Sequence, residues 1–171
     1  QCSVHRAILK LLETRKRGCA ENWDQKVVRL KIRGPDLECR INAQLFGEAR
    51  VIASSLVGSA NHVLSGQKYT TLFIDEAAQA LEAACWIAMK RASRVVLAGD
   101  HCQLPPTVKS FEAMRGGLAK TLMERIVEKK PEVVTLLKMQ YRMNERIMRF
   151  SSDWFYGGMV EPAPEVKHRG I

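Results

Sequence analysis

The sequence predicts an α/β fold, in which a parallel sheet carries flanking helices and a basic helical segment precedes it. From residue 50 onward, short apolar runs alternate with segments of helical periodicity, which is typical of strands joined by helices. The run Arg94–Ala98 is apolar on both faces, as strands are when helices cover both sides of a parallel sheet. Together these two patterns favour a covered parallel sheet.

The N-terminal segment, residues 1–49, is expected to form two or three basic, partly exposed helices. Apolar residues between Val4 and Leu12 recur at helical spacing. Residues 25–33 are helical or extended, and the pattern does not decide between the two. Gly34-Pro35 is expected to end one element and begin the next, because proline is tolerated in the first turn of a helix.

The elements expected after this segment follow apolar periodicity, caps and prolines. In chain order they are a short strand Val51–Ser54, a stronger strand Tyr69–Ile74, a helix Ala80–Arg91, the strand Arg94–Ala98, a helix Gly117–Lys130, a strand Val133–Met139 and a helix Asn144–Phe155. The helix Gly117–Lys130 is expected to end before Pro131, a common helix stop, and the last helix begins at Asn144, a favourable cap.

Charge indicates a polyanionic partner and composition excludes several classes of protein. The 171 residues include 27 Lys and Arg against 18 Asp and Glu, a net charge of +9. The excess flanks a neutral centre: residues 51–114 hold five basic and five acidic side chains. No apolar run approaches the roughly 18 to 20 residues of a membrane span, and no signal peptide is recognisable. Five cysteines without a CxxC pair favour reduced thiols, hence an intracellular, cytoplasmic protein or a nuclear one in a eukaryote.

Two acids directly follow the strand at 69–74. Ligands of open α/β sheets bind beyond the carboxyl ends of the strands, where Asp75 and Glu76 would lie. An Asp there can hold a magnesium ion, and a neighbouring Glu can orient or deprotonate an attacking water. The alternative is that both acids only cap the following helix, whose N-terminal dipole favours negative charge.

Polar residues also follow the next apolar strand, in the segment Gly99–Thr107. Gln103 carries a donor and an acceptor, which suits it to sense a phosphate oxygen or a catalytic water. The alternative is an ordinary turn between strand and helix. His101 and Cys102 could be metal ligands, but without a second ligand pair the sequence predicts no metal cluster.

An arginine stands after the strand expected at 133–139. Arg142 could stabilise charge on a transferring phosphoryl group, as an arginine finger does. The alternative is an arginine that faces solvent before a helix.

These blocks occur in one order, each at a strand end, and together they resemble a known family. DEAAQ (75–79), GDHCQLPP (99–106) and QYRM (140–143) resemble motifs II, III and IV of superfamily 1 helicases. The stretch IDEAAQALEAACW (74–86) is similar to the branch that contains the nonsense-mediated-decay helicase and the immunoglobulin-mu-binding-protein helicase. VIASSLVG (51–58) resembles the motif Ib region of that branch. The resemblance covers residues 50–156.

The resemblance implies a RecA-like P-loop NTPase that uses ATP and Mg²⁺ to move 5′ to 3′ along single-stranded DNA or RNA and to unwind DNA or RNA. Asp75 would coordinate magnesium, Glu76 would activate water, and Gln79 would contact the phosphate side of the nucleotide. Gln103 would sense the γ-phosphate and Arg142 would be the arginine finger. Single-strand contacts would come from two serines and two prolines: Ser54, Ser55, Pro105 and Pro106.

The same resemblance implies an arrangement of domains. Residues 1–49 would be a helical insertion that offers basic surface to nucleic acid, or else a solvated stalk. Residues 50–139 would be the later part of a first RecA-like domain, and residues 140–171 the start of a second. GxxxxGK[ST] is absent and would lie upstream of Gln1, so the fragment alone is expected to be inactive. The alternative function is a truncated nucleic-acid-binding module without ATPase activity.

Overall fold

The computed structural model describes residues 23–170, which fall into two compact units that meet in sequence between Lys68 and Tyr69. The first unit contains α2 (Trp23–Glu48), η1 (Gly58–Ala60) and η2 (His62–Leu64). The second contains β1 (Tyr69–Ile74), η3 (Ala77–Gln79), α3 (Glu82–Met89), β2 (Ala92–Leu97), α4 (Phe111–Arg115), α5 (Leu122–Lys129), η4 (Pro131–Val133), β3 (Met139–Gln140), α6 (Glu145–Phe155), β4 (Glu161–Pro162) and α7 (Pro164–Lys167). The domain boundaries expected after residues 49 and 139 stay predictions.

The first unit departs from the expected helical segment at Gly34-Pro35. This pair was expected to separate two elements, but α2 continues through it as one helix of 26 residues, and residues 25–33 are helical. Proline removes one backbone donor from a helix. Pro35 lies on an exposed part of α2, so water can hydrate the carbonyl that loses its partner. The helix expected between Val4 and Leu12 lies outside the described residues.

The predicted strand Val51–Ser54 is wrong. The residues that follow it form turns, because local hydrogen bonds replace strand pairing. The Ser55 hydroxyl accepts from the Gly58 amide (3.0 Å), and the Ser59 amide donates to the Ser55 carbonyl (3.0 Å). A serine hydroxyl competes with regular pairing in this way when no neighbouring strand offers partners.

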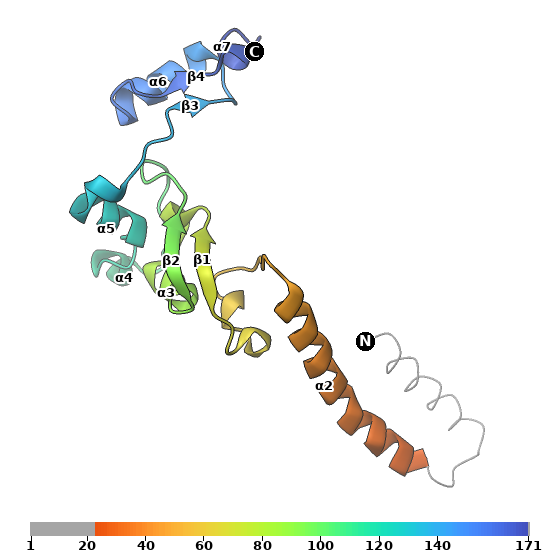
Figure 1. The fold of residues 1–171 in the computed structure, drawn as a ribbon. Coiled ribbons are helices and arrows are strands. Elements are labelled where there is room, and N and C mark those ends of the chain that lie inside the picture. The colour runs from red at the N-terminus through yellow and green to blue at the C-terminus, as the bar shows by residue number, and fades with distance from the viewer. Residues whose placement is uncertain (1–22, 171) are drawn as a thin grey trace. The chain divides into compact units, whose positions relative to one another are not determined.

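A parallel pair of strands forms the sheet of the second unit and confirms the predicted fold class. β1 and β2 lie side by side (Figure 1), with Ile74 opposite Leu97 at their carboxyl ends. The prediction Tyr69–Ile74 matches β1 at both ends, and β2 begins two residues before the predicted Arg94. α3 packs on both strands and lies within the helix predicted over 80–91.

The buried apolar side chains of the second unit come from β1, η3, α3, α5, α6 and α7. Ile74, Ala77, Cys85 and Leu122 are buried, and Cys85 is fully inaccessible. Burial, followed by the charge of Glu82, raises the pKa of the Cys85 thiol, so this cysteine stays protonated and apolar.

α5 begins later than the sequence indicates and is fixed by a capping box. The expected start was Gly117, but Gly117 adopts φ 91° and the helix starts at Leu122. The buried Thr121 hydroxyl accepts from the Glu124 amide (3.2 Å), and the Glu124 carboxylate accepts from the Thr121 amide (2.9 Å). These two bonds satisfy donors that the first turn of a helix otherwise leaves free. α5 packs against η3, so this cap also supports the segment after β1.

The predicted strand Val133–Met139 is mostly wrong. Residues 131–133 form η4, and only Met139 and Gln140 pair with a strand, the parallel β4. Val133 and Leu137 are exposed, so their apolar character does not mark a covered strand among the residues described. An apolar run becomes a strand only where another strand accepts its backbone hydrogen bonds.

The predicted helix Asn144–Phe155 and its cap are confirmed by α6. The Asn144 side chain accepts from the Ile147 amide (3.1 Å) and donates to the Arg169 carbonyl (3.0 Å).

Within residues 23–170, no helix combines the length and the apolar character that a membrane span requires.

Thr121→Val should lower the free energy of unfolding of the chain by about 1–2 kcal/mol, because it keeps the volume of a buried side chain but removes the cap of α5. Urea denaturation measures this change. Ser110→Ala is the matched control, since Ser110 caps the exposed five-residue α4 (3.2 Å to the Ala113 amide). A short surface helix can fray without unfolding the rest, so the control should cost less than about 0.5 kcal/mol. Equal effects of the two changes would contradict the importance of this cap.

Candidate functional site

The two predicted motifs of the sheet meet at the carboxyl ends of β1 and β2. Because the strands are parallel and end in register, the segments that follow them begin at the same edge. The Ala98 amide donates to the Ile74 carbonyl (2.8 Å), and the Ala77 amide donates to the Ala98 carbonyl (2.8 Å). Backbone hydrogen bonds therefore join the DEAAQ segment directly to the GDHCQ segment.

Gly99 allows the two segments to approach closely. A Cβ at this position would lie 3.0 Å from the Ala77 amide nitrogen and 3.0 Å from that of Ala78, which is tighter than nine in ten Cβ contacts in proteins. Ala77 and Ala78 are themselves buried, so their backbone has little room to move away. Close packing thus favours glycine at this position of GDHCQ, and a left-handed conformation does not.

Asp75 and Glu76 are exposed beyond the end of β1, and the backbone of Glu76 is strained. Glu76 has φ 51° and ψ 39°, and no other non-glycine residue in 23–170 has a positive φ. The Asp75 carboxylate accepts from the Glu76 amide (3.0 Å), and the Gln79 amide group donates to the Glu76 carboxylate (3.5 Å). Left-handed non-glycine residues cost about 1–3 kcal/mol and concentrate at functional sites. The strain therefore favours a functional role over simple helix capping.

Gln103 is held by an acid to which the sequence assigned no role. Its side-chain NH₂ donates to the Asp100 carboxylate (2.8 Å), which also accepts from the Cys102 amide (3.1 Å) and the Tyr156 hydroxyl. Partial burial opposes ionisation of Asp100, but these hydrogen bonds outweigh it and lower the pKa of its carboxyl. An acid three residues before Gln103 could have been noticed in the sequence. Tyr156 is 56 residues from Asp100, and no sequence pattern indicates their contact.

Arg142 has a fixed backbone and an exposed side chain. The Gln140 side-chain oxygen accepts from the amides of Arg142 and Met143 (2.8 Å each). The Arg142 guanidinium forms no hydrogen bond or ion pair with residues 23–170, while Glu145, the nearest acid in sequence, pairs with Arg149 (3.0 Å). No hydrogen bond links Arg142 to the acids after β1 in this part of the chain, so its approach to them stays a prediction.

The residues predicted to contact single strands differ in exposure. Ser54 and Ser55 are exposed and belong to the first unit. Pro105 is exposed in the second unit, whereas Pro106 is buried, so of the two prolines only Pro105 offers surface to a ligand in this structure.

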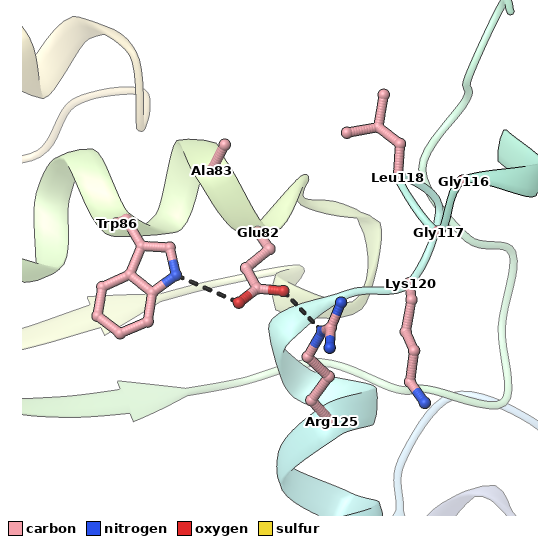
Figure 2. Close-up of a pocket in the computed structure, with 8 residues that line it drawn as sticks. All are labelled: Glu82, Ala83, Trp86, Gly116, Gly117, Leu118, Lys120 and Arg125. Carbon is pink, nitrogen blue, oxygen red and sulfur yellow. Dashed lines mark hydrogen bonds and ion pairs between the residues drawn. The ribbon is translucent and has the colours of Figure 1, made fainter. Parts of the chain in front are cut away.

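A cavity of about 380 Å³ lies between α3 and α5, and none of the predicted site residues lines it. Figure 2 shows Glu82 at its centre, accepting from the Trp86 indole (3.3 Å) and pairing with Arg125 (2.7 Å). These interactions join the two helices. The cavity therefore belongs to the framework that holds the candidate site and is distinct from the site itself.

The chain matches two family models, each described as an AAA domain, over residues 9–111 and 118–171. It is 35% identical over 145 residues to an ATP-dependent helicase of Methanocaldococcus jannaschii. It is 39% identical over 133 residues to the DNA polymerase alpha-associated DNA helicase A of Schizosaccharomyces pombe, and 45% identical over 128 residues to the DNA-binding protein SMUBP-2 of Mesocricetus auratus. The chain belongs to the superfamily 1 helicases.

These relatives place the superfamily 1 helicase chain in the branch that its motifs resemble, and its parallel strands agree with a RecA-like P-loop fold. The alignments cover 85%, 77% and 72% of the chain but only 21%, 19% and 13% of these three relatives. The chain thus spans about a fifth of their length or less.

Gly99→Ala should destabilise this helicase chain by about 1–3 kcal/mol, because the added methyl group forces the two joined segments apart. Urea denaturation with tryptophan fluorescence measures the loss. Gly47→Ala is the matched control: Gly47 lies inside α2 with nothing within 4 Å of an added Cβ, so alanine should stabilise that helix by up to about 1 kcal/mol. If Gly99→Ala were neutral, the two segments would not be held as closely as described.

Proposed function

We propose that the complete protein is an ATP-dependent helicase that couples ATP hydrolysis to movement along single-stranded DNA or RNA, 5′ to 3′. The observation that carries this proposal is the joint between Ala77 and Ala98, which keeps Asp75, Glu76 and Gln103 in adjacent segments at one sheet edge. Relatives with helicase names support it. The basic flanks of the chain agree with a polyanionic track.

Asp75 and Glu76 have the chemistry that a magnesium site requires. Carboxylate oxygens are the ligands that this hard cation prefers, and both side chains are exposed where a nucleotide can reach them. In the proposal Asp75 holds the ion, directly or through water. Bound magnesium supplies neutralising charge at the phosphate oxygens.

The other side chains act by orientation and by charge. Glu76 orients the attacking water or accepts its proton, and its carboxylate accepts a hydrogen bond from the Gln79 side chain (3.5 Å). Gln79 contacts the phosphate side of the nucleotide, and Gln103 contacts the γ-phosphate. Arg142 stabilises the charge that develops on the transferred phosphoryl group.

The nucleic-acid track and the domains belong to the same proposal. Ser54, Ser55 and the Pro105-Pro106 turn contact the single strand, of which Pro105 is the accessible proline. Residues 1–49 form the helical insertion, residues 50–139 complete the first RecA-like domain and residues 140–171 begin the second. The DNA tasks in the names of the relatives support an intracellular site of action.

Glu76→Gln should lower kcat for ATP at least about 100-fold in the complete protein, with ATP binding largely unchanged, because the carboxylate acts mainly in the transition state. Steady-state ATPase assays with saturating single-stranded nucleic acid measure kcat, and fluorescent-nucleotide titration measures binding. Glu112→Gln, an exposed acid in the first turn of α4, is the control and should keep normal kcat. A wild-type protein that binds nucleic acid but hydrolyses no ATP would favour the binding-module alternative.

Arg142→Ala should reduce kcat by about 10³-fold or more, because its guanidinium is proposed to face charge that develops only during phosphoryl transfer. Arg142→Lys should recover only part of the loss, since lysine keeps the charge but not the planar fork. Arg146→Ala, at an exposed position in the first turn of α6, is the control. Normal kcat in Arg142→Ala would identify the arginine as structural.

A further inference from the structure

The Asp100 carboxylate accepts three hydrogen bonds within the protein. Oδ1 accepts from the Cys102 amide (3.1 Å), and Oδ2 accepts from both the Gln103 NH₂ group and the Tyr156 hydroxyl. Asp100 is half-buried, whereas Gln103 is exposed. Asp100 thus holds the side-chain amide of Gln103, which is proposed to contact the γ-phosphate.

A carboxylate selects one of two orientations of a glutamine amide. The oxygen and the NH₂ group of Gln are similar in size, so packing alone does not distinguish them. An ionised carboxylate only accepts hydrogen bonds, so it attracts the NH₂ group and repels the oxygen. With Gln103 turned this way, its oxygen and its second N–H remain free for a water molecule and a phosphate oxygen.

Tyr156 connects this acid to the helix that follows Arg142. α6 begins three residues after Arg142 and ends at Phe155, so Tyr156 stands directly beyond its C-terminal end. A second contact lies alongside: the Cys102 thiol is 3.8 Å from the Phe155 carbonyl oxygen. The motif III segment is therefore tied at two points to the far end of this helix.

The protonation states of both partners suit the bond. Burial, the hydrogen bond to Asp100 and its negative charge raise the pKa of Tyr156, so the phenol remains a donor at neutral pH. The lowered pKa of Asp100 keeps that carboxylate an acceptor. Asp100, His101 and Cys102 also have potential metal-ligand atoms within 4.8 Å of one another. Because both oxygens of Asp100 already accept hydrogen bonds within the protein, the geometry favours positioning over metal binding.

We propose that Asp100 is a positioning residue that fixes the amide orientation of Gln103 for the nucleotide, and that Tyr156 supports it from the end of α6. This inference rests on the proposed function, because it assigns Asp100 a role that acts through the γ-phosphate contact of Gln103. It also gives the helix after Arg142 a direct connection to motif III.

Asp100→Asn tests the orientation. Asparagine presents an NH₂ group of its own, so Gln103 can turn and offer its oxygen instead. In the complete protein we expect kcat for ATP to fall about tenfold or more, while KM for ATP changes less than about threefold. Tyr156→Phe keeps the ring and the carboxylate, so kcat should fall less, by about threefold. Tyr69→Phe is the matched control, since the Tyr69 hydroxyl is buried without a partner among residues 23–170, and it should keep normal kcat.

A double-mutant cycle separates positioning from a structural role. In a Gln103→Ala background, Asp100→Asn should change kcat less than about twofold, because the residue through which it acts is gone. A structural role would instead produce the same loss in both backgrounds, and that result would overturn the inference. Thermal unfolding of each variant checks that the loss in kcat is not a loss of folded protein.

The two levels of the proposal fail differently. Wild-type protein without ATPase activity would overturn the proposed function and this inference with it. Wild-type ATPase activity that Asp100→Asn leaves unchanged would overturn the inference alone.

Discussion

The close backbone joint between residues 77–78 and 98–99 is the constraint on which the rest of the candidate site depends. Two hydrogen bonds of 2.8 Å join Ala98, the residue after β2, to the last residue of β1 and to the first residue of η3. The absence of a side chain at Gly99 lets the segments meet, and the Met123 sulfur of α5 lies 3.3 Å from where a Cβ would stand. The polar segments that follow β1 and β2 are thereby joined to each other.

Helix caps extend this rigidity to the flanking segments. Thr121 caps α5, which packs on η3, and Asn144, two residues after Arg142, caps α6. The backbone of Arg142 is consequently held by Gln140 before it and by the cap after it, although its guanidinium is free of partners within residues 23–170. A fixed main chain with an uncommitted side chain is the arrangement that an incoming anionic ligand requires.

The sequence predicts correctly those elements whose stability depends on neighbouring residues in the chain. The six residues of β1 and the cap of α6 follow from β-branched runs and from an asparagine before a helical face, and both were predicted correctly. The predicted strand Val133–Met139 is mostly wrong, because an apolar run does not indicate whether a partner strand lies beside it. α2 continues through Pro35, where the exposed surface lets water replace the lost bond. Motif resemblance assigns roles to Asp75 and Gln103, and these stay predictions. The contact of Asp100 with Tyr156 joins residues 56 positions apart, and no periodicity in the sequence indicates it.

The distribution of ion pairs gives the last step of the argument. Three acids of the helices have a cation nearby: Glu82 pairs with Arg125, Glu128 with Lys120, and Glu145 with Arg149. Asp75 and Glu76 are adjacent in sequence, and neither forms an ion pair with residues 23–170. Two neighbouring carboxylates gain more from a divalent cation than from any single lysine, because one ion neutralises both charges. The strained backbone of Glu76 opposes stability at this edge, and the metal–nucleotide complex proposed to bind there would offset that cost.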